Sequence, residues 1–195
     1  NYPYYVKHSG RPGASLLAWL IDRYFGYLVR TRTDIAIPIA PILPVHGVPN
    51  VVRDARIIGA LPAFSKIAPV EAGNRGVYFL GRLVWEKGLK SLIDVSSRMN
   101  LPIDIFGDGP DRSAIENYAD DMSAPVRFLG ATDSPWAKLG DYRVFFNPSL
   151  SETLCMTNIE ALVAGRHVVL PDCPAFSLYK SYPNVHFYQD EDGAC

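Results

Sequence analysis

The stretch GVYFLGRLVWEKGLKSLIDVSSRMNLPIDIFG, residues 76–107, decides the fold of this chain. Two short runs of β-branched and aromatic residues, 77–80 and 103–107, read as strands. The segment between them, about residues 88–99, is expected to form a helix. A strand, a helix and a second strand at this spacing are typical of a βαβ unit, in which the two strands run parallel.

The same alternation continues toward the C-terminal end of the chain. We expect strands at 126–130, 144–148, 167–170 and 185–188, and helices at about 111–121, 135–139, 154–164 and 175–182. This order predicts an α/β fold, a Rossmann-like doubly wound parallel sheet with helices on both faces.

Residues 1–75 follow another pattern. A helix is expected at about Ala14–Arg30, then the proline-rich IPIAPILPVHGVPN, residues 37–50, which excludes a long central strand. Residues 51–75 are expected to be linker and loop. The apolar run of the helix is broken at Asp22 and Arg23, and it is shorter than the ~20 residues of a membrane span. It fits an amphipathic helix packed on a core, or an interfacial membrane helix.

Composition sets further bounds. The net charge of −1 gives no reason to expect a nucleic-acid partner. The three cysteines form no CxxC pair and are odd in number, which favours a reducing compartment without disulfides. The chain starts and stops abruptly, with no initiator Met and no signal peptide, so we expect a fragment.

Ligands of such sheets bind beyond the carboxyl ends of the strands. Arg82 and Lys87 share the loop after the first strand, and backbone N–H groups at 153–155 are expected to open a helix. Together these groups can hold a diphosphate, although the two cations could also be solvated loop charges. There is no GxxxxGK[ST] stretch, and GDGPDRS lacks the third glycine of a dinucleotide fingerprint.

Two carboxylates, Glu152 and Glu160, flank the start of the expected helix 154–164. Carboxylates accept hydrogen bonds from paired sugar hydroxyls, so we expect one acid at each end of a nucleotide sugar. Two other interpretations stay open at this point. The acids could be the general acid and base of a hydrolase, or an exposed helix acid beside a partner of the helix dipole.

Four segments, FLGRLVWEKGLKSLIDV, IFGDGPD, RFLGATD and FFNPSLSETLCMTNIEALVAGRHVVLPDCP, resemble the donor half of retaining GT-B glycosyltransferases. The E-x(7)-E signature of that family is matched by Glu152 and Glu160. More closely, LVWEKG, NPSLSETLC, CPAFSLYKSYPN, NYPYYVK and VHGVPN are similar to the digalactosyldiacylglycerol synthase family of plants and algae.

The resemblance implies a GT-B fold in which residues 1–70 are a small remnant of the N-terminal acceptor domain. Residues 71–195 would be the nucleotide-sugar donor-binding domain, without its last helix. The implied activity is a hexosyltransferase that moves galactose from UDP-galactose to monogalactosyldiacylglycerol and gives digalactosyldiacylglycerol; the fragment alone is expected to be inactive. The acceptor would lie at a membrane surface, and the protein would be peripheral on the chloroplast envelope.

The resemblance also implies roles for single residues. Arg82, Lys87 and Glu152 would be catalytic, stabilising the leaving diphosphate and holding the donor sugar. The expected donor-binding residues are Gly81, Gly107, Asp108, Gly109, Gly130, Asp133, Thr153, Leu154, Cys155 and Glu160. No cofactor or metal is expected, because the two cations can supply the positive charge that a divalent ion would bring.

One departure from the family pattern is Thr153-Leu154-Cys155, where the family often has Gly-Phe-Gly. The added β-carbons narrow the approach of the backbone to a ligand, and we interpret them as a mark of the galactolipid subgroup. Two alternatives remain for the function: a retaining GT-B glycosyltransferase with another donor or acceptor, and a non-catalytic nucleotide-sugar-binding domain.

Overall fold

The computed structural model describes residues 7, 11–36, 45, 47–51, 76–149, 152 and 155–189 of the chain. The chain divides into two compact units, Asn1–Gly59 and Ala60–Cys195. The expected domain boundary between residues 70 and 71 lies outside the described residues, and the origin of residues 1–70 in an acceptor domain stays a prediction.

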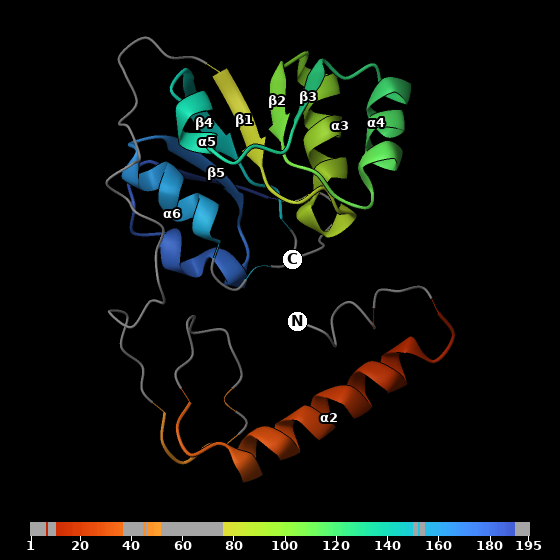
Figure 1. Ribbon diagram of the computed structural model, residues 1–195, viewed down its shortest axis with the longest axis vertical. Helices are drawn as coiled ribbons and strands as arrows, with labels where there is room; N and C mark the ends of the chain where they lie inside the picture. The colour runs from red at the N-terminus through yellow and green to blue at the C-terminus, as the bar shows by residue number, and fades with distance from the viewer. Residues whose placement is uncertain are drawn as a thin grey trace. The chain divides into compact units, whose positions relative to one another are not determined.

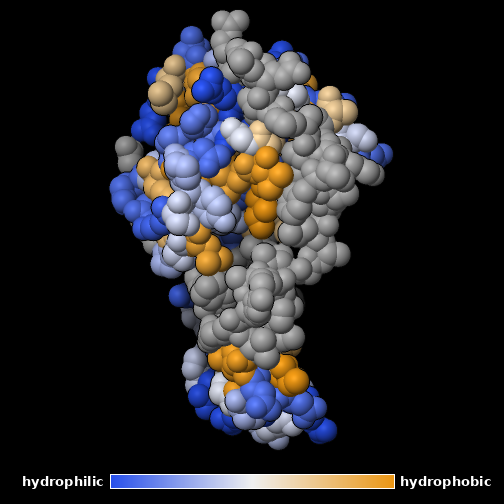
Figure 2. All heavy atoms as spheres, turned by 90° about the vertical axis from the view of Figure 1, so that its left-hand side faces the viewer, coloured by the Kyte–Doolittle hydropathy of each residue, from blue (hydrophilic) through white to orange (hydrophobic). Residues whose placement is uncertain are grey.

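The first unit contains α2 (Ala14–Arg32), which is two residues longer than expected. Ala14 and Ala18 are buried, but most large apolar side chains of this helix are exposed. They are Leu16, Leu17, Trp19, Leu20, Tyr24, Phe25 and Tyr27. Figure 2 shows apolar side chains on the face of this unit that it draws. Within the described residues, no helix has the length and apolar character that a membrane crossing requires.

The second unit is built on a six-stranded sheet in the order β3-β2-β1-β4-β5-β6 (Figure 1). All five neighbouring pairs of strands are parallel. The strands are β1 (Gly76–Leu80), β2 (Ile103–Phe106), β3 (Val126–Gly130), β4 (Tyr142–Phe146), β5 (His167–Pro171) and β6 (Val185–Tyr188). The strand order reverses between β1 and β4, so the predicted doubly wound parallel sheet is confirmed.

Helical segments connect the strands (Figure 1). The α-helices are α3 (Leu89–Met99), α4 (Arg112–Asp121), α5 (Pro135–Lys138) and α6 (Met156–Val163), and the 3₁₀ turns are η2 (Trp85–Lys87) and η3 (Pro174–Tyr179).

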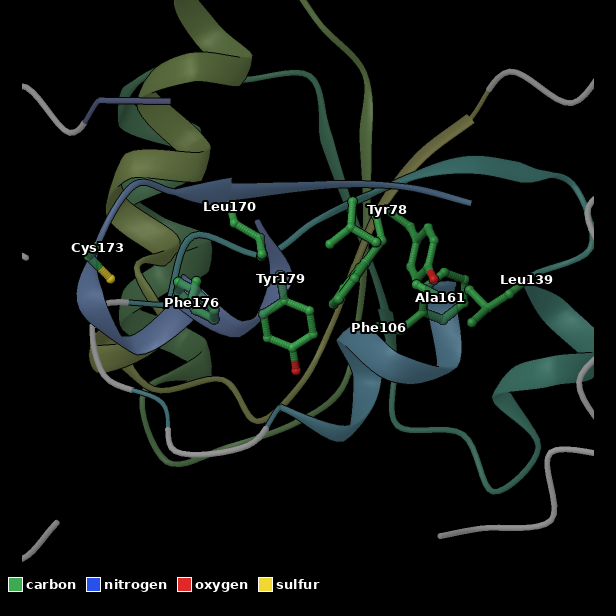
Figure 3. Close-up of a cluster of buried hydrophobic side chains, with 10 residues drawn as sticks. Tyr78, Phe106, Leu139, Ala161, Leu170, Cys173, Phe176 and Tyr179 are labelled. Atoms are coloured by element: carbon green, nitrogen blue, oxygen red, sulfur yellow. The ribbon is translucent and has the colours of Figure 1, made fainter. Parts of the chain in front are cut away.

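Both faces of the sheet are buried, because successive strand residues point to opposite faces. Tyr78 belongs to one buried cluster and Phe79 to the other. The first cluster, partly drawn in Figure 3, lies toward α6 and η3; it contains Tyr78, Phe106, Leu139, Phe145, Ala161, Val168, Leu170, Cys173, Phe176 and Tyr179. The second lies toward α3 and α4; it contains Phe79, Leu83, Leu89, Leu92, Ile93, Ile103, Ile105, Ile115, Ala119 and Phe146.

Three expected boundaries are wrong in detail. The strand expected at 144–148 is β4 (Tyr142–Phe146), because Pro148 has no N–H to donate to a ladder. The α-helix expected at 175–182 is η3, whose i and i+3 side chains eclipse, so Phe176 and Tyr179 both reach the core. The helix expected from residue 154 begins at Met156.

Candidate functional site

The loops that follow β1, β2 and β3 are joined to each other through their backbones. The N–H of Gly81 donates to the carbonyl of Phe106 (3.1 Å), and that of Leu83 donates to Asp108 (2.9 Å). The N–H of Gly107 donates to the carbonyl of Gly130 (2.8 Å). Because the strands are parallel, these loops share the carboxyl edge of the sheet with the loop after β4, which carries Glu152.

Two glycines are required by the close packing of these loops. A β-carbon on Gly107 would lie 1.8 Å from the carbonyl oxygen of Gly81, and one on Gly109 would lie 2.2 Å from that of Leu83. Asp108 is exposed and interacts within its own segment: it accepts a hydrogen bond from the N–H of Gly109 (2.7 Å) and forms an ion pair with Arg112 (3.7 Å). The part of these residues in lining a nucleoside stays a prediction.

Lys87 and Glu152 form an ion pair between segments that are 65 residues apart in the sequence. The ammonium group of Lys87, at the end of η2, donates to Oε1 of Glu152. The side chains are 28% and 12% exposed. The structure thus brings together two of the three residues expected to be catalytic, in a partly buried position where the attraction between charges is screened less than at the surface.

The turn beside Lys87 packs directly on the chain beside Glu152. Gly88 has a φ of 69°, in the left-handed region, and a β-carbon there would lie 1.9 Å from the carbonyl oxygen of Pro148. Only glycine satisfies both demands. This contact holds the end of η2 against the loop that follows β4.

A buried polar network occupies the space between β4 and the start of α6. The Oδ1 of Asn147 accepts hydrogen bonds from the N–H (3.2 Å) and the hydroxyl (2.6 Å) of Ser149. Its Nδ2 donates to Sγ of Cys155 (3.3 Å) and to Oδ1 of Asn158 (2.8 Å). These residues are all buried.

Cys155 is the N-cap residue of α6, and its surroundings keep the thiol protonated. Burial, with a smaller effect of the nearby carboxylate of Glu152, raises the pKa of the Cys155 thiol to about 11. The hydroxyl of Tyr179, a residue labelled in Figure 3, donates to the carbonyl of Cys155 (3.3 Å). Cys155 is therefore a packing element and not a nucleophile at neutral pH.

Glu160 is the fifth residue of α6 and lies about one helical turn from its start. Its carboxylate is partly buried, and among the described residues it has no hydrogen-bond or ion-pair partner. Burial raises its pKa. Burial raises the pKa of Tyr78 in β1, Arg166 lowers it, and the charge of Glu160 adds a smaller increase. An unpaired, partly desolvated carboxylate is suited to accept hydrogen bonds from a ligand.

For the other residues expected at the site, the structure gives fewer contacts. Arg82 and Asp133 are exposed, and their side chains form no hydrogen bond or ion pair within the described part of the chain. Gly130 ends β3 with a φ of 75°. Thr153 and Leu154 lie outside the described residues. Over that same part of the chain, no group of three or more His, Cys, Asp or Glu side chains could hold a metal ion.

Sequence reasoning did not predict the parts of Gly88, Asn147 and Asn158. Gly88 could have been noticed as a glycine just before a helix start. Asn158 is a polar residue at a buried position of α6, which is a signal for an internal hydrogen bond. Asn147 gives no such signal, because its burial depends on segments that are distant in the sequence.

Comparisons with known proteins agree on one family. The sequence profile of "Glycosyl transferases group 1" matches residues 74–181, more than half of the chain. Digalactosyldiacylglycerol synthase 1 of Glycine max is 31% identical over 98% of this chain, which confirms the resemblance found in the sequence. A GDP-mannose-dependent alpha-mannosyltransferase of Mycolicibacterium smegmatis is 33% identical over 86% of the chain. The chain spans 26% and 46% of the lengths of these two relatives.

Among solved structures, the S. aureus protein TarM has a similar fold. Its complex with fondaparinux, alpha-GlcNAc-glycerol and UDP matches 88% of this chain with a TM-score of 0.69 and 19% identity; the match covers 38% of TarM. At this identity the likeness concerns the fold alone. It confirms the expected α/β fold of the GT-B type.

Proposed function

Because the chain belongs to the family Glycosyl transferases group 1, we propose that its sheet-containing unit binds a nucleotide sugar at the carboxyl edge of the sheet. The single observation that carries this proposal is the partly buried pair of Lys87 and Glu152. Glu152 precedes the N-cap residue of α6 by three positions, and backbone N–H groups and the dipole at a helix start favour an anionic ligand. An unpaired acid, Glu160, follows about one turn further along the helix.

In this proposal each charged residue binds a particular part of the ligand. Arg82 and Lys87 bind the diphosphate and stabilise the negative charge that develops on it as the sugar leaves. Such electrostatic stabilisation is commonly the largest catalytic term. Glu152 accepts hydrogen bonds from the donor sugar, and Glu160 accepts them from the ribose hydroxyls. In the absence of ligand, Lys87 and Glu152 neutralise each other.

For the whole protein we propose the transfer of galactose from UDP-galactose to monogalactosyldiacylglycerol, which gives digalactosyldiacylglycerol at a membrane surface. The similarity to digalactosyldiacylglycerol synthase 1 over nearly the whole chain supports this choice of donor and acceptor. A peripheral location on the chloroplast envelope rests on the same relative, which is named as chloroplastic.

A second candidate is favoured by a specific observation, the 33% identity to a GDP-mannose-dependent enzyme. The donor-base and sugar contacts then differ, while the diphosphate contacts remain. A third candidate, of another class, is a nucleotide-sugar-binding domain without catalytic activity.

The experiment uses the longer protein that contains this chain, purified and mixed with vesicles of monogalactosyldiacylglycerol. UDP-galactose, UDP-glucose and GDP-mannose are supplied in turn, and the lipid products are separated. We expect digalactosyldiacylglycerol with UDP-galactose only. Product with GDP-mannose alone would favour the second candidate. Nucleotide binding without any product from these donors would favour the third.

A further inference from the structure

One buried side chain bonds both ends of the loop that carries Glu152. Asn147, 2% exposed, follows β4 directly. Its oxygen holds Ser149 at the entry of the loop, and its amide nitrogen holds Cys155 and Asn158 at the exit.

The direction of these hydrogen bonds is fixed by the backbone. The N–H of Ser149 is a donor only, so the atom of Asn147 that faces it must be the amide oxygen. The amide nitrogen of Asn147 therefore points to α6, where it requires an acceptor, and this sets Oδ1 of Asn158 toward it. The other end of this side chain, Nδ2 of Asn158, is buried and has no hydrogen-bond partner among the described residues.

Apolar side chains could not replace this network without a penalty. A buried donor without an acceptor costs about 1–3 kcal/mol, and the N–H of Ser149 would become such a donor if residue 147 were apolar. The two asparagines also have a geometric effect, because they join β4, the loop after it and the first turn of α6.

We infer that Asn147 is a positioning residue: it closes the loop between Ser149 and Cys155 and so fixes the Glu152 carboxylate against Lys87. The inference rests on the proposed part of Glu152 in holding the donor sugar. The contact of Gly88 with Pro148 restrains the Lys87 side of the same pair. With both sides held, Lys87 and Glu152 reach the ligand from fixed positions of the backbone.

The first test needs no ligand. Asn147→Leu removes both sets of hydrogen bonds and keeps the branched shape and the number of side-chain heavy atoms. The amide of Ser149 loses its acceptor, so its hydrogen exchange should become at least about tenfold faster. The matched control is Ser96→Ala, which removes a hydrogen bond from a fully buried hydroxyl in α3. It should leave the exchange of Ser149 unchanged. Unchanged exchange in Asn147→Leu would overturn the inference.

The second test measures kcat and KM of the longer protein for its nucleotide sugar. Asn147→Leu should lower kcat by about ten- to a hundredfold through misplacement of the carboxylate, with a much smaller change in KM. In a Glu152→Gln background, the same substitution should lower kcat no further, since the group through which it acts is already lost. An equal loss of kcat in both backgrounds would mean that Asn147 acts by another route.

Asn158→Leu is the alternative variant for the kinetic test if Asn147→Leu does not fold. It cuts only the tie to α6 and leaves Ser149 bonded. Its smaller loss of kcat should also disappear in the Glu152→Gln background, and a loss that persists there would contradict the inference. If the wild-type protein turns over no nucleotide sugar, the proposed function fails, and the exchange of Ser149 still decides whether Asn147 closes the loop.

Discussion

At the scale of single residues, Glu160 should lower the stability of the fold at neutral pH. Burial raises its pKa, so the folded chain binds more protons than the unfolded chain between the two pKa values. Stability then falls as pH rises through this window, and the cost persists above it. Glu160→Gln should raise the urea midpoint at pH 7, and the gain in the free energy of unfolding should be less than about 1 kcal/mol because the group is partly solvated. Below about pH 4 it should have no effect.

The control for this measurement is Asp121→Asn, which removes an exposed carboxylate at the end of α4. It changes the net charge by the same amount without relieving desolvation. If both variants shift the midpoint equally at each pH, net charge is responsible and Glu160 is not destabilising.

The two acids should differ in the kinetics of the longer protein. Glu160→Gln weakens hydrogen bonds to a part of the donor that is remote from the breaking bond. It should therefore raise KM, with a loss of donor-binding free energy of about 1.5–3 kcal/mol. Glu152→Gln and Arg82→Ala affect groups whose charge or position changes in the transition state. They should lower kcat more than they raise KM. Steady-state kinetics with each folded variant, compared with Asp121→Asn, separates the roles. A large loss of kcat in Glu160→Gln with near wild-type Glu152→Gln would reverse them.

At the scale of elements, the junction of η2, α3 and the loop after β4 depends on Gly88. Gly88→Ala should lower the free energy of unfolding in two ways. A residue with a β-carbon in the left-handed region costs about 1–2 kcal/mol, and the displacement of Pro148 costs about 1–3 kcal/mol more. Gly165→Ala is the matched control, because Gly165 has a φ of 76° and open space around its α-carbon. Urea unfolding of both variants checks the difference. Equal losses of stability would show that the contact with Pro148 relaxes at little cost.

The same elements show what the sequence could predict. The alternation of strand-like and helix-like segments correctly predicted the number of strands and their order along the chain from β1 to β6, since parallel sheets are built from repeated local units. The start of β4 and the 3₁₀ form of η3 were mispredicted. Both depend on contacts that the local pattern does not contain: the pairing of Tyr142 with Gly76 of β1, and the demand of the core for Phe176 together with Tyr179.

At the scale of the whole molecule, the two units differ in how far the sequence explains them. The candidate site was predictable where charged residues follow strands, as Lys87 and Glu152 do, because the parallel order brings those loops to one edge. The network around Asn147 was not, since the burial of its members depends on how other segments pack around them. In the first unit, periodicity predicted α2, but the pattern did not indicate that Leu16, Trp19 and their neighbours would be exposed.

The chain alone should bind UDP weakly and transfer no sugar. Every described residue of the proposed donor site lies in the second unit, so we expect nucleotide binding to need only that unit. Transfer also needs an acceptor held in line with the donor, and this proximity can contribute about 7–11 kcal/mol to lowering the barrier. The chain spans only 26% of the length of digalactosyldiacylglycerol synthase 1 of Glycine max. Calorimetry with UDP, and an assay with UDP-galactose and monogalactosyldiacylglycerol vesicles, measure the two properties.

Variants of the isolated chain show whether the weak binding comes from the proposed site. Arg82→Ala and Glu160→Gln should each reduce the affinity for UDP, because one removes a diphosphate contact and the other weakens the contacts to ribose. Asp121→Asn should bind as the wild type does. UDP binding that is insensitive to Arg82 and Glu160 would place the nucleotide elsewhere. Formation of digalactosyldiacylglycerol by the isolated chain would show that its residues already hold both substrates, contrary to the proposed division between a donor half and an acceptor half.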